Sequence, residues 1–123
     1  MNDLLLKQYI GLIECNNEKI SILANTSAFI MQNFQDISWA GFYLFKNNEL
    51  ILGPFQGKIA CTNIPLDKGV CGKAASTRKT VIVENVHQFA GHIACDSESN
   101  SEIVIPLIKG NQLYGVLDLD STS

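Results

Sequence analysis

Two segments close to the C-terminal end, Glu102–Lys109 and Leu113–Asp120, flank the turn-forming triplet Gly110-Asn111-Gln112. This arrangement predicts an antiparallel hairpin with a three-residue turn, in which successive side chains point to opposite faces. A three-residue turn aligns the apolar positions of both strands on one face. We expect helices to cover this face as the core, and it comprises Ile103, Ile105, Leu107, Gly115, Leu117 and Leu119.

The opposite face of this hairpin would bring three carboxylates together at one end, those of Glu102, Asp118 and Asp120. A two-residue turn would separate Glu102 from the aspartates and mix the two faces, so the apolar pattern favours the longer turn. Charged groups at strand ends are commonly just solvated. Closely spaced carboxylates can instead raise one another's proton affinity, so that one donates a proton while the others hold an ammonium group. That second interpretation would suit an amino acid as ligand.

The rest of the chain predicts an α+β domain with two N-terminal helices followed by strands. Apolar spacing of three and four residues predicts helices, and aromatic-rich or β-branched runs bounded by turn residues predict strands. Trp39 and Tyr43 would share one face of the first strand, and the face that carries Phe42 would lie under the helices. The expected helices are Asp3–Glu14, Ile20–Phe34 and Val70–Thr77, and the strands are Ser38–Phe45, Glu49–Phe55, Thr62–Leu66 and a buried Val81–Val83.

Composition limits the classes of protein to which the chain can belong. Its 123 residues, 46% of them hydrophobic, fit one domain spanning residues 1–123. The net charge is −3 and the lysines are dispersed, which argues against a nucleic-acid partner. The chain has no apolar run of the roughly 20 residues that a membrane span needs and no secretion signal at its start. We therefore expect a cytoplasmic protein that does not bind membranes.

The cysteines point to thiol chemistry. Cys95 lies in the polar, turn-rich stretch from Gly91 to Glu102, where a structural cysteine would have little to pack against. The segment from Glu84 to Ser101 that contains it has no clear periodicity. A loop of that length in a small domain usually has a function. Cys61 and Cys71 lie beside glycine or turn residues and could form a redox cycle with Cys95. The gaps of 10 and 24 residues between these three cysteines do not match a zinc site, so we expect no metal.

Taken together, these motifs resemble the free methionine-(R)-sulfoxide reductase family, which consists of small GAF-domain enzymes. The resemblance runs from the second expected helix to Ser121. It is carried by the Cys95 loop and by the segments Trp39–Leu44, Leu52–Gly57, Gly69–Ala75 and Gly115–Ser121. It implies a central antiparallel sheet with helices on one face and a ligand pocket under loops on the other.

The resemblance also implies an activity and a set of residue roles. The family reduces the R epimer of free methionine sulfoxide, needs no cofactor and is regenerated by thioredoxin. Its nucleophile falls on Cys95 and its recycling thiol on Cys61, while Cys71 matches a third family cysteine whose role stays open. The substrate methyl group would lie against Trp39, with Tyr43 close by. The acidic residues around the sulfoxide and the amino group match Glu102, Asp118 and Asp120, with Glu102 the preferred proton donor.

Two alternatives and one departure accompany this interpretation. A GAF-type sensor would bind a small molecule without catalysis, because a fold does not determine a function. A thiol redox switch would be oxidised without turnover. Family members continue after the Asp118-Leu119-Asp120-Ser121 segment into a C-terminal helix, whereas this sequence stops at Ser123. We therefore expect part of the apolar sheet face to be uncovered, or to be covered by a second copy in a homodimer.

Overall fold

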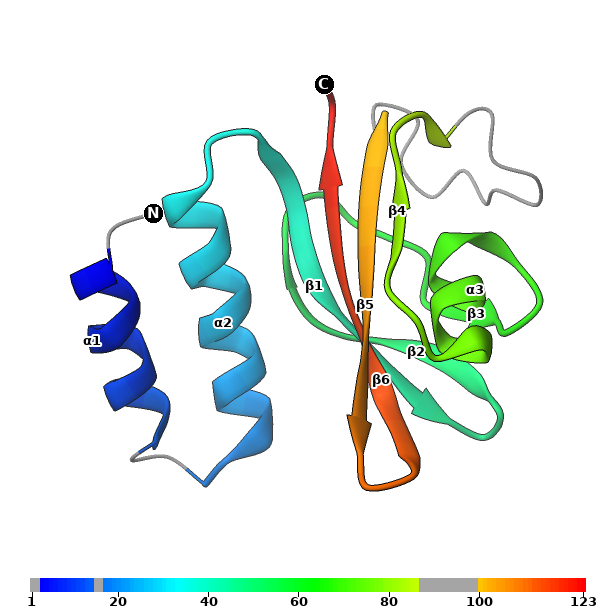
Figure 1. The fold of residues 1–123 in the computed structure, drawn as a ribbon, viewed down its shortest axis with the longest axis horizontal. Coiled ribbons are helices and arrows are strands. Elements are labelled where there is room, and N and C mark those ends of the chain that lie inside the picture. Colours follow the sequence, from blue (N-terminus) through cyan, green and yellow to red (C-terminus); the bar gives the residue numbers. More distant parts are fainter. Residues whose placement is uncertain (1–2, 15–16, 87–99) are drawn as a thin grey trace.

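A computed structural model describes residues 3–14, 17–86 and 100–123 of the chain. Six strands form one antiparallel sheet in the order β3-β2-β1-β6-β5-β4, and three helices flank it (Figure 1). This architecture confirms the expected α+β class. In chain order the elements are α1 (Asp3–Glu14), α2 (Lys19–Asn33), β1 (Ile37–Lys46), β2 (Glu49–Gln56), β3 (Asn63–Pro65), α3 (Gly69–Thr77), β4 (Val81–Val83), β5 (Ser101–Lys109) and β6 (Gln112–Ser121).

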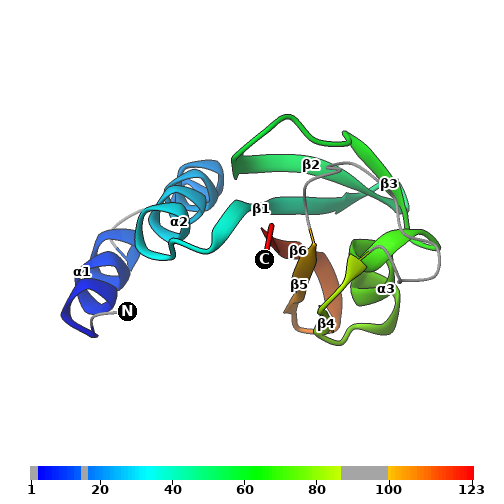
Figure 2. The ribbon, with the colours of Figure 1, turned by 90° about the horizontal axis from the view of Figure 1, so that it is seen from above.

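The helices lie on both sides of the sheet rather than on one. Seen from above, α1 and α2 occupy one side, and α3 lies on the other side against the curled sheet (Figure 2). Helix α2 packs on β1 and β2 through the buried side chains of Leu23 and Ser27. Helix α1 contacts α2 through the stacked rings of Tyr9 and Phe29, whose centroids are 4.3 Å apart.

The largest buried cluster lies beneath α3, on the sheet face opposite to the one expected from the sequence. The apolar face that contains Ile105 and Leu117 is only half-buried, whereas Val104 and Val116 on the other face are fully buried. Gly72 lets α3 pass close to the end of β3, because a Cβ added there would lie 2.8 Å from the Pro65 carbonyl oxygen. The cluster comprises Trp39, Tyr43, Leu50, Ile64, Val70, Cys71, Ala74, Ala75, Val104 and Val116.

The β5–β6 hairpin has the expected facing but a different turn. Glu102 pairs with Asp120 and Val104 with Asp118, which places the three carboxylates on one face as predicted. The turn, however, has two residues, because Lys109 pairs with Gln112. The register shift between Leu107 and Ile108 reflects an extra residue on the β6 side, since Leu107 pairs with Gly115 and Ile108 with Leu113, leaving Tyr114 between them. Such a bulge restores the register that the three-residue turn was expected to give.

The edges of the sheet show one further difference from expectation. Strand β4 pairs only with β5 at the end of the sheet, and Ile82 at its centre is 68% exposed, so the expected buried strand is an exposed edge strand.

At the β1–β2 turn, Asn47 and Asn48 both have positive φ angles, of 54° and 63°. This is the pattern of the type I′ turn that suits a two-residue hairpin. No helix within the described residues combines the length and apolarity that crossing a membrane requires.

Candidate active site

Three potential ligand groups converge on the face of the sheet that α3 covers. Cys71 comes from the first turn of α3, Glu102 from the start of β5 and Asp118 from β6. One ligand atom from each lies within 4.8 Å of the other two. The Cys71 thiol donates to Glu102 Oε2 at 3.8 Å. Strand pairing therefore brings together two carboxylates that are 16 residues apart in the sequence, and α3 adds a thiol.

Asp118 is the most unusual member of this group, because it is a carboxyl group with only 5% of its surface exposed. Its Oδ1 atom has no hydrogen-bond partner among the described residues. Burial raises the pKa of Asp118 well above its usual value, and the nearby charges of Glu102 and Asp120 raise it further. A buried acceptor without a donor is destabilising. The site is therefore suited to a ligand that brings a positive charge or an N–H donor.

Cys71 is a buried free thiol. Burial raises its pKa well above the usual value, and the charges of Asp118, Glu102 and Asp120 add to the effect. The thiolate is the nucleophilic form of cysteine, so a raised pKa lowers reactivity at neutral pH. Cys71 is thus placed to act as a hydrogen-bond donor to Glu102. Of the described residues, the cluster of Cys71, Glu102 and Asp118 is the one whose atoms could hold a metal ion.

Two stacked aromatic rings from β1 form a wall beside the carboxylates. Trp39 and Tyr43 are 3% and 2% exposed, and their ring centroids are 6.0 Å apart. Strand pairing sets Trp39 opposite Asp120, two positions from Asp118 on the same face of β6. Burial raises the pKa of Tyr43, and the charges of Cys71 and Asp118 contribute, so its hydroxyl remains a protonated donor. The expected aromatic and acidic residues therefore lie on one face.

Both aromatic side chains also donate hydrogen bonds to the segment between β2 and β3. Trp39 Nε1 donates to the Lys58 carbonyl oxygen at 3.0 Å, and the Tyr43 hydroxyl donates to the Cys61 carbonyl oxygen at 2.9 Å. The half-buried Cys61 is disulfide-bonded. Of the remaining expected site residues, Cys95 lies outside the described residues.

Three residues that support this aromatic wall, Phe55, Gly57 and Gly41, were not predicted as site residues from the sequence. Phe55 stacks on Trp39 with a centroid distance of 5.2 Å. Gly57 has a φ of +132°, and a Cβ there would lie 2.5 Å from Trp39 Cδ1. Gly41 pairs with Phe55 across the strands and leaves room for its side chain, because a Cβ added at Gly41 would lie 2.3 Å from the Phe55 Cβ. Gly41 and Gly57 stand out in the sequence, but only the strand register shows that they make room for the side chains of Trp39 and Phe55.

We expect the substitution Asp118→Asn to stabilise the ligand-free protein at neutral pH. Because the folded-state pKa of Asp118 is raised, the native state binds more protons than the unfolded state at pH values above 3.8. The stability that Asp118 contributes is therefore fully present at low pH and is lost as pH rises through its folded pKa. Asparagine has no charge to bury. Each kcal/mol added to the free energy of unfolding should raise the Tm by roughly 4 °C.

The measurement is the Tm of wild type and Asp118→Asn between pH 4 and pH 8. The variant should melt at a higher temperature at pH 7, and the difference should shrink toward pH 4. The exposed Asp67→Asn is the matched control and should show no such trend. A difference independent of pH would contradict a buried, proton-binding Asp118.

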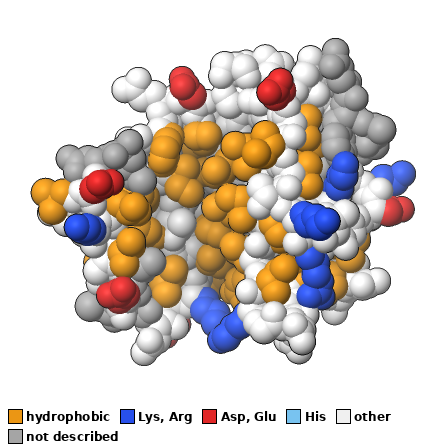
Figure 3. All heavy atoms as spheres, in the orientation of Figure 1, with side chains coloured by type: hydrophobic (Ala, Val, Ile, Leu, Met, Phe, Trp, Pro, Cys, Tyr) orange, Lys and Arg blue, Asp and Glu red, His pale blue; other side chains and the backbone are white. Residues whose placement is uncertain are grey.

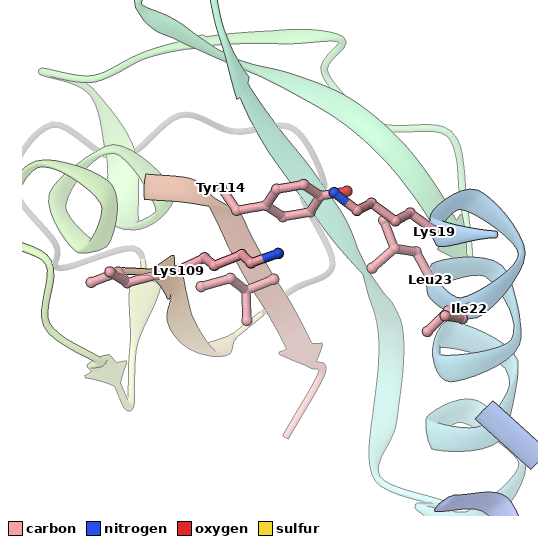
Figure 4. A pocket seen from close by; sticks show the side chains of 7 residues that line it. Lys19, Ile22, Leu23, Lys109 and Tyr114 are labelled. Atoms are coloured by element: carbon pink, nitrogen blue, oxygen red, sulfur yellow. The ribbon is translucent and has the colours of Figure 1, made fainter. Parts of the chain in front are cut away.

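A cavity lies away from the thiols and carboxylates. It occupies about 280 Å³ between α2 and the β5–β6 hairpin (Figure 4) and is lined by Lys19, Ile22, Leu23, Leu107, Ile108, Lys109 and Tyr114. Apolar side chains gather between the N-terminal helices and the strands in the space-filling view (Figure 3). The Lys19 ammonium group lies 5.4 Å from the centroid of the Tyr114 ring. This lining contains no thiol and no carboxylate, so the candidate active site is the one under α3.

Comparisons with known proteins agree with the fold and identify the family. Residues 21–123 match the family model described as GAF domain. The chain is 57% identical over 103 residues to the free methionine-R-sulfoxide reductase of Escherichia coli K12, a match that covers 84% of this chain and 62% of that protein. It is 48% identical to the free methionine-R-sulfoxide reductase of Saccharomyces cerevisiae, over 94% of this chain and 69% of that protein.

A solved structure extends this similarity to three dimensions. The X-ray structure of free methionine-R-sulfoxide reductase from Neisseria meningitidis in complex with its substrate matches with a TM-score of 0.92 at 43% identity. The match covers 96% of this chain and 71% of that chain. The chain thus spans less than two thirds of the length of the Escherichia coli relative, and somewhat more of the other two.

Proposed function

Because the chain belongs to the free methionine-R-sulfoxide reductase family of GAF domains, we propose that it reduces free L-methionine (R)-S-oxide to L-methionine. The observation that carries the proposal is the buried Asp118 oxygen without a partner among the described residues, beside Glu102 and under the wall of Trp39 and Tyr43. A free amino acid brings the ammonium group that this oxygen lacks, whereas a methionine sulfoxide within a peptide chain does not.

The substrate would lie between the aromatic wall and the carboxylates. Asp118 and Asp120 would hold its ammonium group, since charge-assisted hydrogen bonds to carboxylates are strong in a buried site. The S-methyl group would pack against Trp39, with Tyr43 beside it, because aromatic rings provide apolar surface and favourable contacts with sulfur. The Neisseria meningitidis enzyme, solved in complex with its substrate, supports substrate binding by a domain of this shape.

The chemistry would begin with the Cys95 thiolate attacking the sulfoxide sulfur. Glu102 would protonate the sulfoxide oxygen, because an unprotonated oxide is not a viable leaving group. The oxygen passes to the Cys95 sulfur, which becomes a sulfenic acid, and methionine departs with two more electrons on its sulfur. The Cys71 thiol, held against Glu102 Oε2, would position that carboxyl group.

Recycling would follow through a disulfide. The Cys61 thiol condenses with the Cys95 sulfenic acid, releasing water and forming the S–S bond. Two observations support Cys61 over Cys71 in this step: Cys61 is disulfide-bonded, and the buried Cys71 remains a free thiol. A thioredoxin-type dithiol would then reduce the disulfide and be oxidised itself. Such a cycle needs a steady supply of reductant, which supports a cytoplasmic location.

One assay tests the proposal. The protein is incubated with free methionine (R)-sulfoxide, thioredoxin, thioredoxin reductase and NADPH, and loss of NADPH absorbance is followed. Turnover is expected with the R epimer and not with the S epimer or with N-acetylmethionine sulfoxide, which lacks the ammonium group. Binding of the R epimer without NADPH loss would favour a sensor, and oxidation of the thiols without turnover would favour a redox switch.

We also propose that the protein forms a homodimer. Apolar side chains of the N-terminal helices are unusually exposed, with Leu4, Leu12 and Ile20 each more than 60% accessible. A second copy would bury these side chains, which is favourable in proportion to the apolar area removed from water. Sedimentation equilibrium is expected to give twice the monomer mass of 13.5 kDa, and the substitution Leu12→Asp should shift the mass toward the monomer. A wild-type protein that stays monomeric would refute the proposal.

A further inference from the structure

Ile59 is the most exposed of the large apolar side chains in the described part of the chain, at 91%. The next in order, Ile82, is 68% exposed. Single apolar side chains on a surface are common and need no explanation in themselves. Ile59 differs in its location, because it lies two residues before the disulfide-bonded Cys61, on the segment between β2 and β3.

The backbone on both sides of Ile59 is held in place by buried side chains. Trp39 Nε1 binds the carbonyl oxygen of Lys58, immediately before Ile59, and the Tyr43 hydroxyl binds that of Cys61. Just upstream, Gly57 crosses the Trp39 ring so closely that no side chain would fit there. Because the donors are fixed within the sheet, the segment presents Ile59 outward beside the disulfide rather than folding it inward.

This segment has the features that a protein reductant needs. The reductant must bring a thiolate within bonding distance of a sulfur atom, and Cys61 is half-exposed whereas Cys71 is buried. An apolar side chain on a rigid backbone can act as an anchor for a partner, because little entropy is lost when it is buried. The cavity between α2 and the β5–β6 hairpin (Figure 4) offers no target for such a reductant, since no thiol lines it.

We propose that Ile59, with the Lys58–Cys61 backbone, is the docking surface for a thioredoxin-type dithiol protein. This inference rests on the proposed function. The partner's thiolate attacks Cys61 Sγ, the bond between Cys61 and Cys95 breaks, and Cys95 leaves as a thiolate that takes up a proton. The partner's second thiol then attacks the mixed disulfide. Cys61 is released as a thiol, and the two electrons come from the dithiol, which becomes a disulfide.

The test compares two reductants and two isoleucines. In Ile59→Ser, the KM for thioredoxin should rise roughly tenfold, the effect of losing one interface anchor. The rate with dithiothreitol, a small dithiol that needs no docking surface, should stay at the wild-type value. The control Ile82→Ser replaces an exposed isoleucine at the opposite edge of the sheet and should change neither value.

The outcomes separate this inference from the proposed function. An unchanged KM for thioredoxin in Ile59→Ser, or an equal loss with both reductants, would overturn the docking surface. No methionine formation by the wild type with dithiothreitol would instead refute the proposed function. In that case, reduction of the Cys61 disulfide by thioredoxin can be followed directly by thiol labelling. The Ile59→Ser variant should still be reduced more slowly than the Ile82→Ser variant.

Discussion

Replacing Cys95 with serine is expected to abolish methionine formation, including the first molecule produced per enzyme. A serine hydroxyl cannot form the sulfenic acid that accepts the substrate oxygen, and no metal or organic cofactor is proposed to take over the two-electron transfer. The loss should therefore exceed that from any other single cysteine substitution. The measurement is methionine released in a single turnover, quantified by chromatography after mixing enzyme with one equivalent of the R epimer.

The other cysteines provide the controls for this experiment. Cys61→Ser should still release one methionine per enzyme but should fail in thioredoxin-driven turnover, because the thiol proposed to condense with the sulfenic acid is gone and Cys71 is buried. The sulfenic acid left in that variant should be trapped by dimedone. Cys71→Ser should retain the disulfide. If Cys95→Ser keeps its first turnover, Cys95 is not the nucleophile and Cys71 becomes the candidate, despite the burial that raises its pKa.

The strands and helices were predictable because their local patterns are strong. The β5–β6 facing followed from the alternation that keeps one face apolar, and the structure has the same facing. The predicted turn was one residue too long, because the extra residue lies within β6 as a bulge at Tyr114. A bulge and a longer turn each add one residue between the paired strands, so both give the same set of side chains on each face. The alternation of side chains therefore cannot distinguish between them.

The position of the core could not be predicted from the hairpin alone. An entirely apolar face suggested burial there, yet the opposite face packs more tightly, with Val104 and Val116 fully buried. That face is covered by α3, a short helix whose small residues offered little apolar signal in the sequence. Gly72 also lets α3 pass close to the Pro65 carbonyl at the end of β3. The contacts of α3 with β5 and β6, by contrast, join segments that are distant in the sequence, and such tertiary contacts override local patterns.

The sequence predicted which aromatic and acidic side chains share a face of the sheet, but not the hydrogen bonds that hold them. Pairing of β5 with β6 brought the carboxylates together as expected. No pattern in the sequence indicated that Trp39 and Tyr43 would bind the carbonyls of Lys58 and Cys61. Every residue carries a backbone carbonyl, so the residue types do not mark which one serves as a partner. The link between the aromatic wall and the Cys61 segment is therefore visible only in three dimensions.

We expect the substitution Glu102→Gln to lower kcat by roughly 10²- to 10⁴-fold, the range typical of losing a general acid. Glutamine keeps the shape of the side chain and can still accept from the Cys71 thiol, but it cannot transfer a proton to the sulfoxide oxygen. Asp118 remains beside the site, although it is occupied with the ammonium group in the proposed complex. The loss should therefore appear mainly in kcat, with a smaller change in KM.

The comparison uses Glu14→Gln, which removes an exposed carboxylate at the end of α1, far from the site, and should leave kcat unchanged. Methionine release is measured in single turnover, so that recycling through Cys61 does not limit the rate. If Glu102→Gln raises KM alone, Glu102 binds the substrate and the proton comes from elsewhere. Asp118 would then be the first candidate, because burial and its acidic neighbours already favour its protonated form. The effects of Glu102→Gln and Asp118→Asn on kcat thus decide which of two adjacent carboxyl groups is the acid.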